Sequence, residues 1–195
     1  LAESGLSNSG WEEVGVLSLS SGDYACLNPL LDDFLARWEA ERVALSLPSL
    51  RTETMTPSLA ERIARVRKTG FTLAPEAATD RLRAVINKGN READLLAAVA
   101  SVFANGWSLL KLYFMIGLPH ETDEDVAAIA SLARRCIEAG RRAAAGGKGS
   151  VAINLAASTF VPKPHTPFQW DPMIRPEETR RRQGIVTTAL GGVVT

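Results

Sequence analysis

Residues 109–122 read LLKLYFMIGLPHET, and this segment indicates the fold class more firmly than any other part of the chain. The eight residues before Gly117 are apolar apart from Lys111, which predicts a strand with helices packed against it. Gly117 and the proline that follows soon after end the strand. Thr122 and Asp125 then match a capping box, so a helix is expected to begin there. A strand, a short loop and a long helix are the repeating unit of parallel α/β proteins.

The same alternation extends in both directions from this segment. We expect further strands at 14–19, 43–47, 71–74 and 151–157, the third of them stopped by Pro75, and helices at 28–38, 56–70, 80–87, 91–105 and from 176. Right-handed crossovers place the carboxyl ends of such strands at one rim, where ligands bind in barrels and open α/β sheets alike. The loops expected there are 20–23, 48–51, 75–79, 117–121 and 160–170.

Composition excludes several classes of protein. The 195 residues carry 22 basic and 22 acidic side chains, and a net charge of zero argues against a nucleic-acid-binding surface. No apolar run approaches the roughly 18 residues of a membrane span, and the first residues lack a secretory signal. We therefore expect a cytoplasmic protein. Because the first residue is leucine rather than methionine, we also expect the chain to begin inside a longer protein.

Two of the expected rim loops contain polar side chains that can bind a ligand, and each side chain also has a purely structural explanation. In the turn at 20–23, Asp23 can pair with an ammonium group, but turn chemistry alone accounts for these residue types. Glu76 follows the third expected strand, where a carboxylate can accept hydrogen bonds from ribose hydroxyls. A solvated glutamate at a helix start is the alternative for Glu76.

The remaining reactive side chains give weaker signals. His120 and His165 can act as acid or base, although neither has a paired carboxylate or thiol at a diagnostic spacing. Cys26 and Cys136 are read as packing residues. Arg180-Arg181-Arg182 is read as a solvated helix face. No dinucleotide-binding glycine motif, Walker loop or nucleophile elbow occurs.

Five blocks of the chain, taken in order, resemble the radical S-adenosylmethionine (SAM) superfamily, and most closely its Fe–S oxidoreductases that often carry a cobalamin-binding region. The blocks are 17–24 (LSLSSGDY), 45–51 (LSLPSLR), 71–78 (FTLAPEAA), 114–122 (FMIGLPHET) and 160–170 (FVPKPHTPFQW). The resemblance implies an α/β fold, a partial TIM-type parallel (β/α)6 barrel of which about five strands are present. It implies that residues 1–195 are a single fragment of that barrel, in which a Pro-rich loop at 160–176 leads to the C-terminal helix.

The resemblance also implies a role for particular residues at the rim. The block around the first expected strand places three residues at the SAM amino group, and the second places two at its carboxylate, for which Lys88 is a further candidate. Glu76 matches the ribose position, and three residues of the last two blocks match the adenine contacts. The implied set is Ser21, Gly22 and Asp23 for the amino group, Ser49, Arg51 and Lys88 for the carboxylate, Glu76 for the ribose, and Ile116, Gly117 and Val161 for the adenine.

The chain departs from the family at the iron–sulfur cluster. The family's C-x-x-x-C-x-x-C loop is missing, and the two cysteines present are 110 positions apart. The resemblance therefore implies that the first strand and the ligands of the [4Fe–4S] cluster lie outside this chain. A longer parent enzyme would cleave SAM to a 5′-deoxyadenosyl radical, and the fragment alone would be inactive. Cobalamin in the parent and the identity of the substrate are left open.

Two other classes of function compete with this reading. The first is a non-radical α/β-barrel enzyme that uses His120 or His165 as acid or base and needs no iron. The second is a non-catalytic interaction module whose Pro-rich loop at 160–172 docks a partner. Enzymes that thiomethylate tRNA belong to the same superfamily, but the zero net charge gives no nucleic-acid footprint through this fragment. SAM is thus the expected small-molecule partner.

Overall fold

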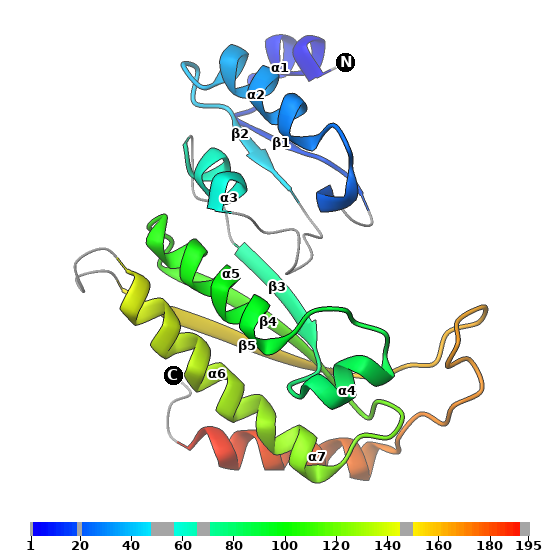
Figure 1. The fold of residues 1–195 in the computed structure, drawn as a ribbon. Helices are drawn as coiled ribbons and strands as arrows, with labels where there is room; N and C mark the ends of the chain where they lie inside the picture. The colour runs from blue at the N-terminus through cyan, green and yellow to red at the C-terminus, as the bar shows by residue number, and fades with distance from the viewer. Residues whose placement is uncertain (1, 19–20, 48–56, 66–70, 145–149, 192–195) are drawn as a thin grey trace.

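Parallel strands and helices alternate along the chain in the computed structural model, which describes residues 2–18, 21–47, 57–65, 71–144 and 150–191 (Figure 1). The strands form two parallel sheets, one of order β1-β2 and one of order β3-β4-β5. The helices are α1 (Ala2–Ser9), the 3₁₀ turn η1 (Ser21–Asp23), α2 (Leu27–Trp38), α3 (Pro57–Ala64), α4 (Asp80–Val85), α5 (Glu92–Ala104), α6 (Asp123–Ala143) and α7 (Pro176–Leu190). The strands are β1 (Glu13–Gly15), β2 (Ala44–Ser46), β3 (Phe71–Glu76), β4 (Leu109–Ile116) and β5 (Ala152–Thr159).

The two-stranded sheet is shorter than the sequence predicted. β1 pairs with β2 in parallel, with Val14 opposite Leu45. One more backbone hydrogen bond, from the Val16 N–H to the Ser46 carbonyl at 3.1 Å, continues the pairing beyond β1. Leu31 and Phe34 of α2 are buried in the same core cluster as Leu45. The amphipathic stripe of α2 thus covers this sheet.

The three-stranded sheet is built around β4, the strand predicted at 109–116. Its alternate side chains Leu110, Leu112, Phe114 and Ile116 are fully buried. They belong to one core cluster with apolar residues of α5 and α6, such as Val99. Because successive strand residues face opposite sides, the other side chains of β4 lie on the face that α5 and α6 leave uncovered.

The prediction that Pro75 stops the third strand is wrong. β3 continues through Pro75 to Glu76, with a shift of register between Leu73 and Glu76. Proline is tolerated because β3 lies at the edge of its sheet, where one missing N–H removes no interior pairing. Glu76 therefore ends the strand in register with Phe114 of β4.

The helix signals read from the sequence are confirmed. Thr122 and Asp125 form the capping box that begins α6, and α7 begins with Pro176 at its first position. Residues 160–175 before α7 contain neither helix nor strand. No helix in the described ranges combines the length and apolar character needed to cross a bilayer.

The predicted α/β fold with parallel strands is confirmed, and it is consistent with a partial parallel (β/α) barrel. Within the described residues, strand pairing does not join the two sheets. Figure 1 shows the strands of both sheets running in the same general direction, so that η1, α4 and the loop after β5 lie at their carboxyl ends. The candidate site residues come from this edge.

Candidate functional site

Glu76 and Lys88 meet at the carboxyl end of β3. The Lys88 ammonium lies 3.5 Å from Glu76 Oε1, and about a quarter of each side chain is exposed. Glu76 holds a left-handed backbone with φ of 66°, which is uncommon for a residue with a side chain. The edge of β3 thus presents a carboxylate and an ammonium side by side, both partly open to solvent.

The ends of β4 and β5 lie next to each other and continue this edge. The Phe160 N–H donates to the Ile116 carbonyl at 2.8 Å, which places the residue after β5 beside the last residue of β4. Ile116 is fully buried, whereas Val161 is half-exposed. Gly117 follows Ile116 with φ of 80°. The predicted adenine residues are therefore neighbours along one edge.

Unusual backbone conformations gather at this edge. The described chain has five non-glycine residues with positive φ. Three of them lie at this edge: Glu76 ends β3, His120 lies in the loop after β4, and His165 lies in the loop after β5. Such conformations cost about 1–3 kcal/mol each and persist where surrounding structure enforces them. Their position supports a functional edge at the carboxyl ends of β3, β4 and β5.

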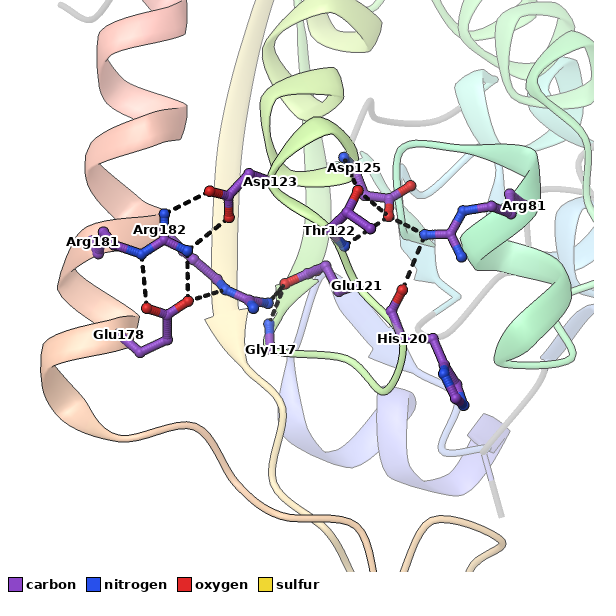
Figure 2. A network of polar contacts seen from close by, with 10 residues as sticks. All are labelled: Arg81, Gly117, His120, Glu121, Thr122, Asp123, Asp125, Glu178, Arg181 and Arg182. Carbon is purple, nitrogen blue, oxygen red and sulfur yellow. Dashed lines mark hydrogen bonds and ion pairs between the residues drawn. The ribbon is translucent and has the colours of Figure 1, made fainter.

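A buried ion pair holds the loop after β4 (Figure 2). The Gly117 N–H donates to Glu121 Oε2 at 2.6 Å, and the guanidinium of Arg182 on α7 pairs with the same oxygen. The Glu121 side chain is 1% exposed and that of Arg182 is 14% exposed. Burial raises the pKa of the Glu121 carboxyl, although the Gly117 N–H and Arg182 act in the opposite direction.

Neighbouring charges on α7 extend this contact, as Figure 2 shows. Arg182 Nε donates to Glu178 Oε1 at 2.7 Å, and Arg181 joins Glu178 to Asp123 at the start of α6. Hydrogen bonds from Arg181 and Arg182 lower the pKa of Glu178 to about 2. The prediction that Arg180-Arg181-Arg182 is a solvated face is therefore wrong for Arg182, whereas Arg180 and Arg181 are exposed.

A second polar cluster holds the other side of the same loop. Asp125 is buried and accepts hydrogen bonds from the Thr79 hydroxyl at 2.6 Å and the Thr122 N–H at 2.9 Å. Burial alone would raise the pKa of Asp125, but these hydrogen bonds outweigh it and the pKa is lowered. Arg81 pairs with Asp125 and donates to the His120 carbonyl at 3.0 Å. The loop after β3 is thereby joined to the loop after β4.

The structure describes three of the five remaining predicted residues. Ser21, Gly22 and Asp23 form η1 after β1, where Ser21 is buried and Asp23 is exposed. They lie at the carboxyl ends of the strands, as Figure 1 shows. Ser49 and Arg51 fall outside the described residues. The structure thus brings together Glu76, Lys88, Ile116, Gly117 and Val161 along one sheet edge.

Both histidines are exposed loop residues. Through its backbone, His120 accepts a hydrogen bond from Arg81 and His165 donates one to Gln169 at 3.2 Å. Within the described ranges, neither imidazole ring has a carboxylate partner that would orient it. A general acid or base of the usual kind needs such an orienting group. The arrangement therefore gives no support to the acid–base alternative.

The cysteines do not provide an iron–sulfur site. The chain has two cysteines. Cys26 is exposed after η1, so the prediction that it is a packing residue is wrong, whereas Cys136 is buried in α6 as predicted. Burial raises the pKa of Cys136 to about 12, which disfavours the thiolate that binds metal. The described residues contain no cluster of three or more histidine, cysteine or acidic side chains suited to a metal ion. A [4Fe–4S] cluster needs more thiolates than these, so the residues present do not fit it.

Comparison with known proteins identifies the family of this chain. Residues 10–133, more than half of the chain, match the radical SAM superfamily. The protein MJ0966 of Methanocaldococcus jannaschii, described as uncharacterized, is 33% identical over 172 residues, which make up 87% of this chain. Those residues cover 34% of MJ0966, so the chain spans about a third of that relative's length. The chain belongs to the radical SAM superfamily.

Proposed function

We propose that this chain is the SAM-binding part of a radical SAM iron–sulfur enzyme. In this proposal the carboxyl edge of β3, β4 and β5 holds the nucleoside, and the cluster ligands are supplied from outside these 195 residues. Membership of the superfamily implies SAM and a [4Fe–4S] cluster as cofactors. Bound together in the whole enzyme, they supply the 5′-deoxyadenosyl radical.

The observation that carries the proposal is the placement of Glu76 beside Lys88 at the edge that also ends in Gly117 and Val161. The donor set fits the cofactor. A carboxylate accepts hydrogen bonds from two ribose hydroxyls, and an ammonium pairs with a carboxylate such as that of the methionyl group. The half-exposed Val161 offers an apolar surface to a flat base.

The other rim residues keep the roles predicted for them. In the proposal, Ser21, Gly22 and Asp23 meet the SAM amino group, and Ser49 and Arg51 share the carboxylate with Lys88. Cobalamin in a longer parent stays a prediction, because neither comparison concerns it.

Replacing Glu76 with glutamine is expected to weaken SAM binding about 10-fold or more, because hydrogen bonds to a charged acceptor contribute about 1.5–3 kcal/mol. The measurement is the SAM dissociation constant by titration calorimetry in the cluster-loaded full-length protein. Glu138→Gln is the control, since Glu138 is exposed on α6 away from the edge. An unchanged dissociation constant in Glu76→Gln would refute the ribose assignment.

The 195-residue chain alone is expected to bind no [4Fe–4S] cluster, because two distant cysteines cannot replace a three-cysteine loop. The test is anaerobic incubation with iron and sulfide, then reduction and electron paramagnetic resonance at low temperature. A signal from a reduced cluster that disappears in the Cys26→Ser, Cys136→Ser double variant would overturn the proposal that the ligands lie elsewhere.

A further inference from the structure

The uncovered face of the larger sheet carries polar side chains that the SAM site does not use. On β4, Lys111 is exposed and Tyr113 is 43% exposed, while the alternate residues Leu110 and Leu112 are fully buried under α5 and α6. Lys111 is the one charged residue in β3, β4 and β5 apart from Glu76 at the end of β3. Because the Lys111 side chain is exposed on this face, its ammonium is available to a ligand.

Strand register places three polar side chains in one row across this face. Lys111 is the register partner of Thr72 on β3 and of Asn154 on β5. Partners in neighbouring parallel strands point to the same side of the sheet, and all three residues are exposed. No ion pair to Lys111 occurs within the described chain, and the one strand carboxylate, Glu76, pairs with Lys88.

The row lies at a defined depth below the proposed cofactor edge. Ile116 comes five positions after Lys111, which corresponds to about 16 Å along a strand. Tyr113 lies between them, and its register partner is the small Ala156. The uncovered face of the sheet therefore presents a cation at the end far from the cofactor edge and a partly exposed aromatic ring in the middle.

We propose that this face of the sheet is a substrate-binding surface. Its residues Lys111, Thr72 and Asn154 bind a carboxylate or phosphate group of an elongated substrate. The three side chains supply an ammonium, a hydroxyl and an amide, which together are a suitable donor set for an anionic oxygen group. The substrate's middle part packs on Tyr113, and its other end reaches the edge of the strands. This inference rests on the proposed function, because the edge is where the reaction would begin.

The test uses nuclear magnetic resonance of the full chain after ¹³C-dimethylation of its five lysines. Lys111→Met assigns the Lys111 signal, and Lys163, exposed in the loop after β5, serves as the internal reference. The probes are 3-phenylpropionate and phenyl phosphate, which distinguish the two anionic groups. Phenethylammonium, with the same ring and the opposite charge, is the control.

We expect one of the anionic probes to shift the Lys111 signal saturably, and Thr72→Val to weaken that binding about 3- to 10-fold. The inference is overturned if the Lys111 signal moves no more than that of Lys163, or if phenethylammonium binds as well as the anions. SAM binding to the cluster-loaded full-length protein is measured separately. A protein that binds the anionic probe but not SAM would refute the proposed function while leaving the anion site in place.

Discussion

Arg182→Met is expected to lower the free energy of unfolding by about 3–5 kcal/mol, because it leaves the Glu121 carboxylate buried without its partner. The Glu121 side chain is 1% exposed, and its two contacts on the same oxygen are Arg182 and the Gly117 N–H. Methionine keeps most of the length of the arginine stem but none of its charge. The measurement is chemical denaturation at pH 7.5.

The loss of unfolding free energy in Arg182→Met is expected to become smaller in acid. This pH dependence identifies the buried Glu121 carboxylate as the cause of the loss. Burial already raises the pKa of Glu121 above its ordinary value of 4.5, and removing Arg182 raises the pKa further. A carboxyl group with a raised folded-state pKa stabilises the fold most below its unfolded-state pKa, and that stability is lost as the pH rises through the folded-state value. The difference between Arg182→Met and wild type should therefore be largest at neutral pH and decrease as the pH falls toward 4.5.

Arg180→Met is the matched control for this variant. Arg180 lies two residues away on α7, and both it and its partner Glu177 are largely exposed. Exposed pairs contribute little, so we expect a change of less than about 0.5 kcal/mol. Adding Glu121→Gln to Arg182→Met should recover part of the loss at pH 7.5. If Arg182→Met loses the same free energy of unfolding at pH 7.5 and at pH 5, lost packing is responsible and not the unpaired Glu121 carboxylate.

Elements with strong local signals could be predicted from the sequence. The strand at 109–116 and the capping box at Thr122 are confirmed residue for residue, because an apolar run and a capping box are properties of neighbours in sequence. The meeting of Glu76 with the ends of β4 and β5 was also foreseen, since parallel topology alone brings the carboxyl ends of strands together.

Features that depend on distant residues could not be predicted in this way. Pro75 reads as a strand stop until β3 is known to be an edge strand, which is a property of the whole sheet. Arg182 lies 61 residues from Glu121, and nothing near it in the sequence distinguishes it from the exposed Arg180. The ion pair between Lys88 and Glu76 could not be predicted either, because the sequence predicts these residues only as separate ligands of SAM.

Gly117→Ala is expected to lower the free energy of unfolding by about 2–4 kcal/mol, for two separable reasons. Gly117 has φ of 80°, a conformation that costs a residue with a Cβ about 1–2 kcal/mol. A Cβ at this position would also lie 2.7 Å from Ile174 Cδ1 and 2.8 Å from Ile174 Cγ1, and overpacking of this kind costs about 1–3 kcal/mol.

Combining Gly117→Ala with Ile174→Ala separates the two costs. The second change removes the close contact but leaves the left-handed backbone, so the double variant should lose less than the sum of the two single changes. Gly184→Ala on α7 is the control, because a Cβ there meets nothing within 4 Å and should stabilise the helix by about 0.5–1 kcal/mol. Exact additivity of Gly117→Ala and Ile174→Ala would contradict the contact part of the argument.

The same variant connects the loop to the proposed cofactor edge. If alanine forces the backbone at residue 117 to negative φ, the N–H no longer points at Glu121, and the end of β4 beside Val161 changes shape. We therefore expect the SAM dissociation constant of folded Gly117→Ala, in the cluster-loaded full-length protein, to rise about 10-fold, while that of Gly184→Ala stays at the wild-type value. Wild-type SAM affinity in Gly117→Ala would remove Gly117 from the adenine contacts, because the backbone there could then change without any effect on the nucleoside.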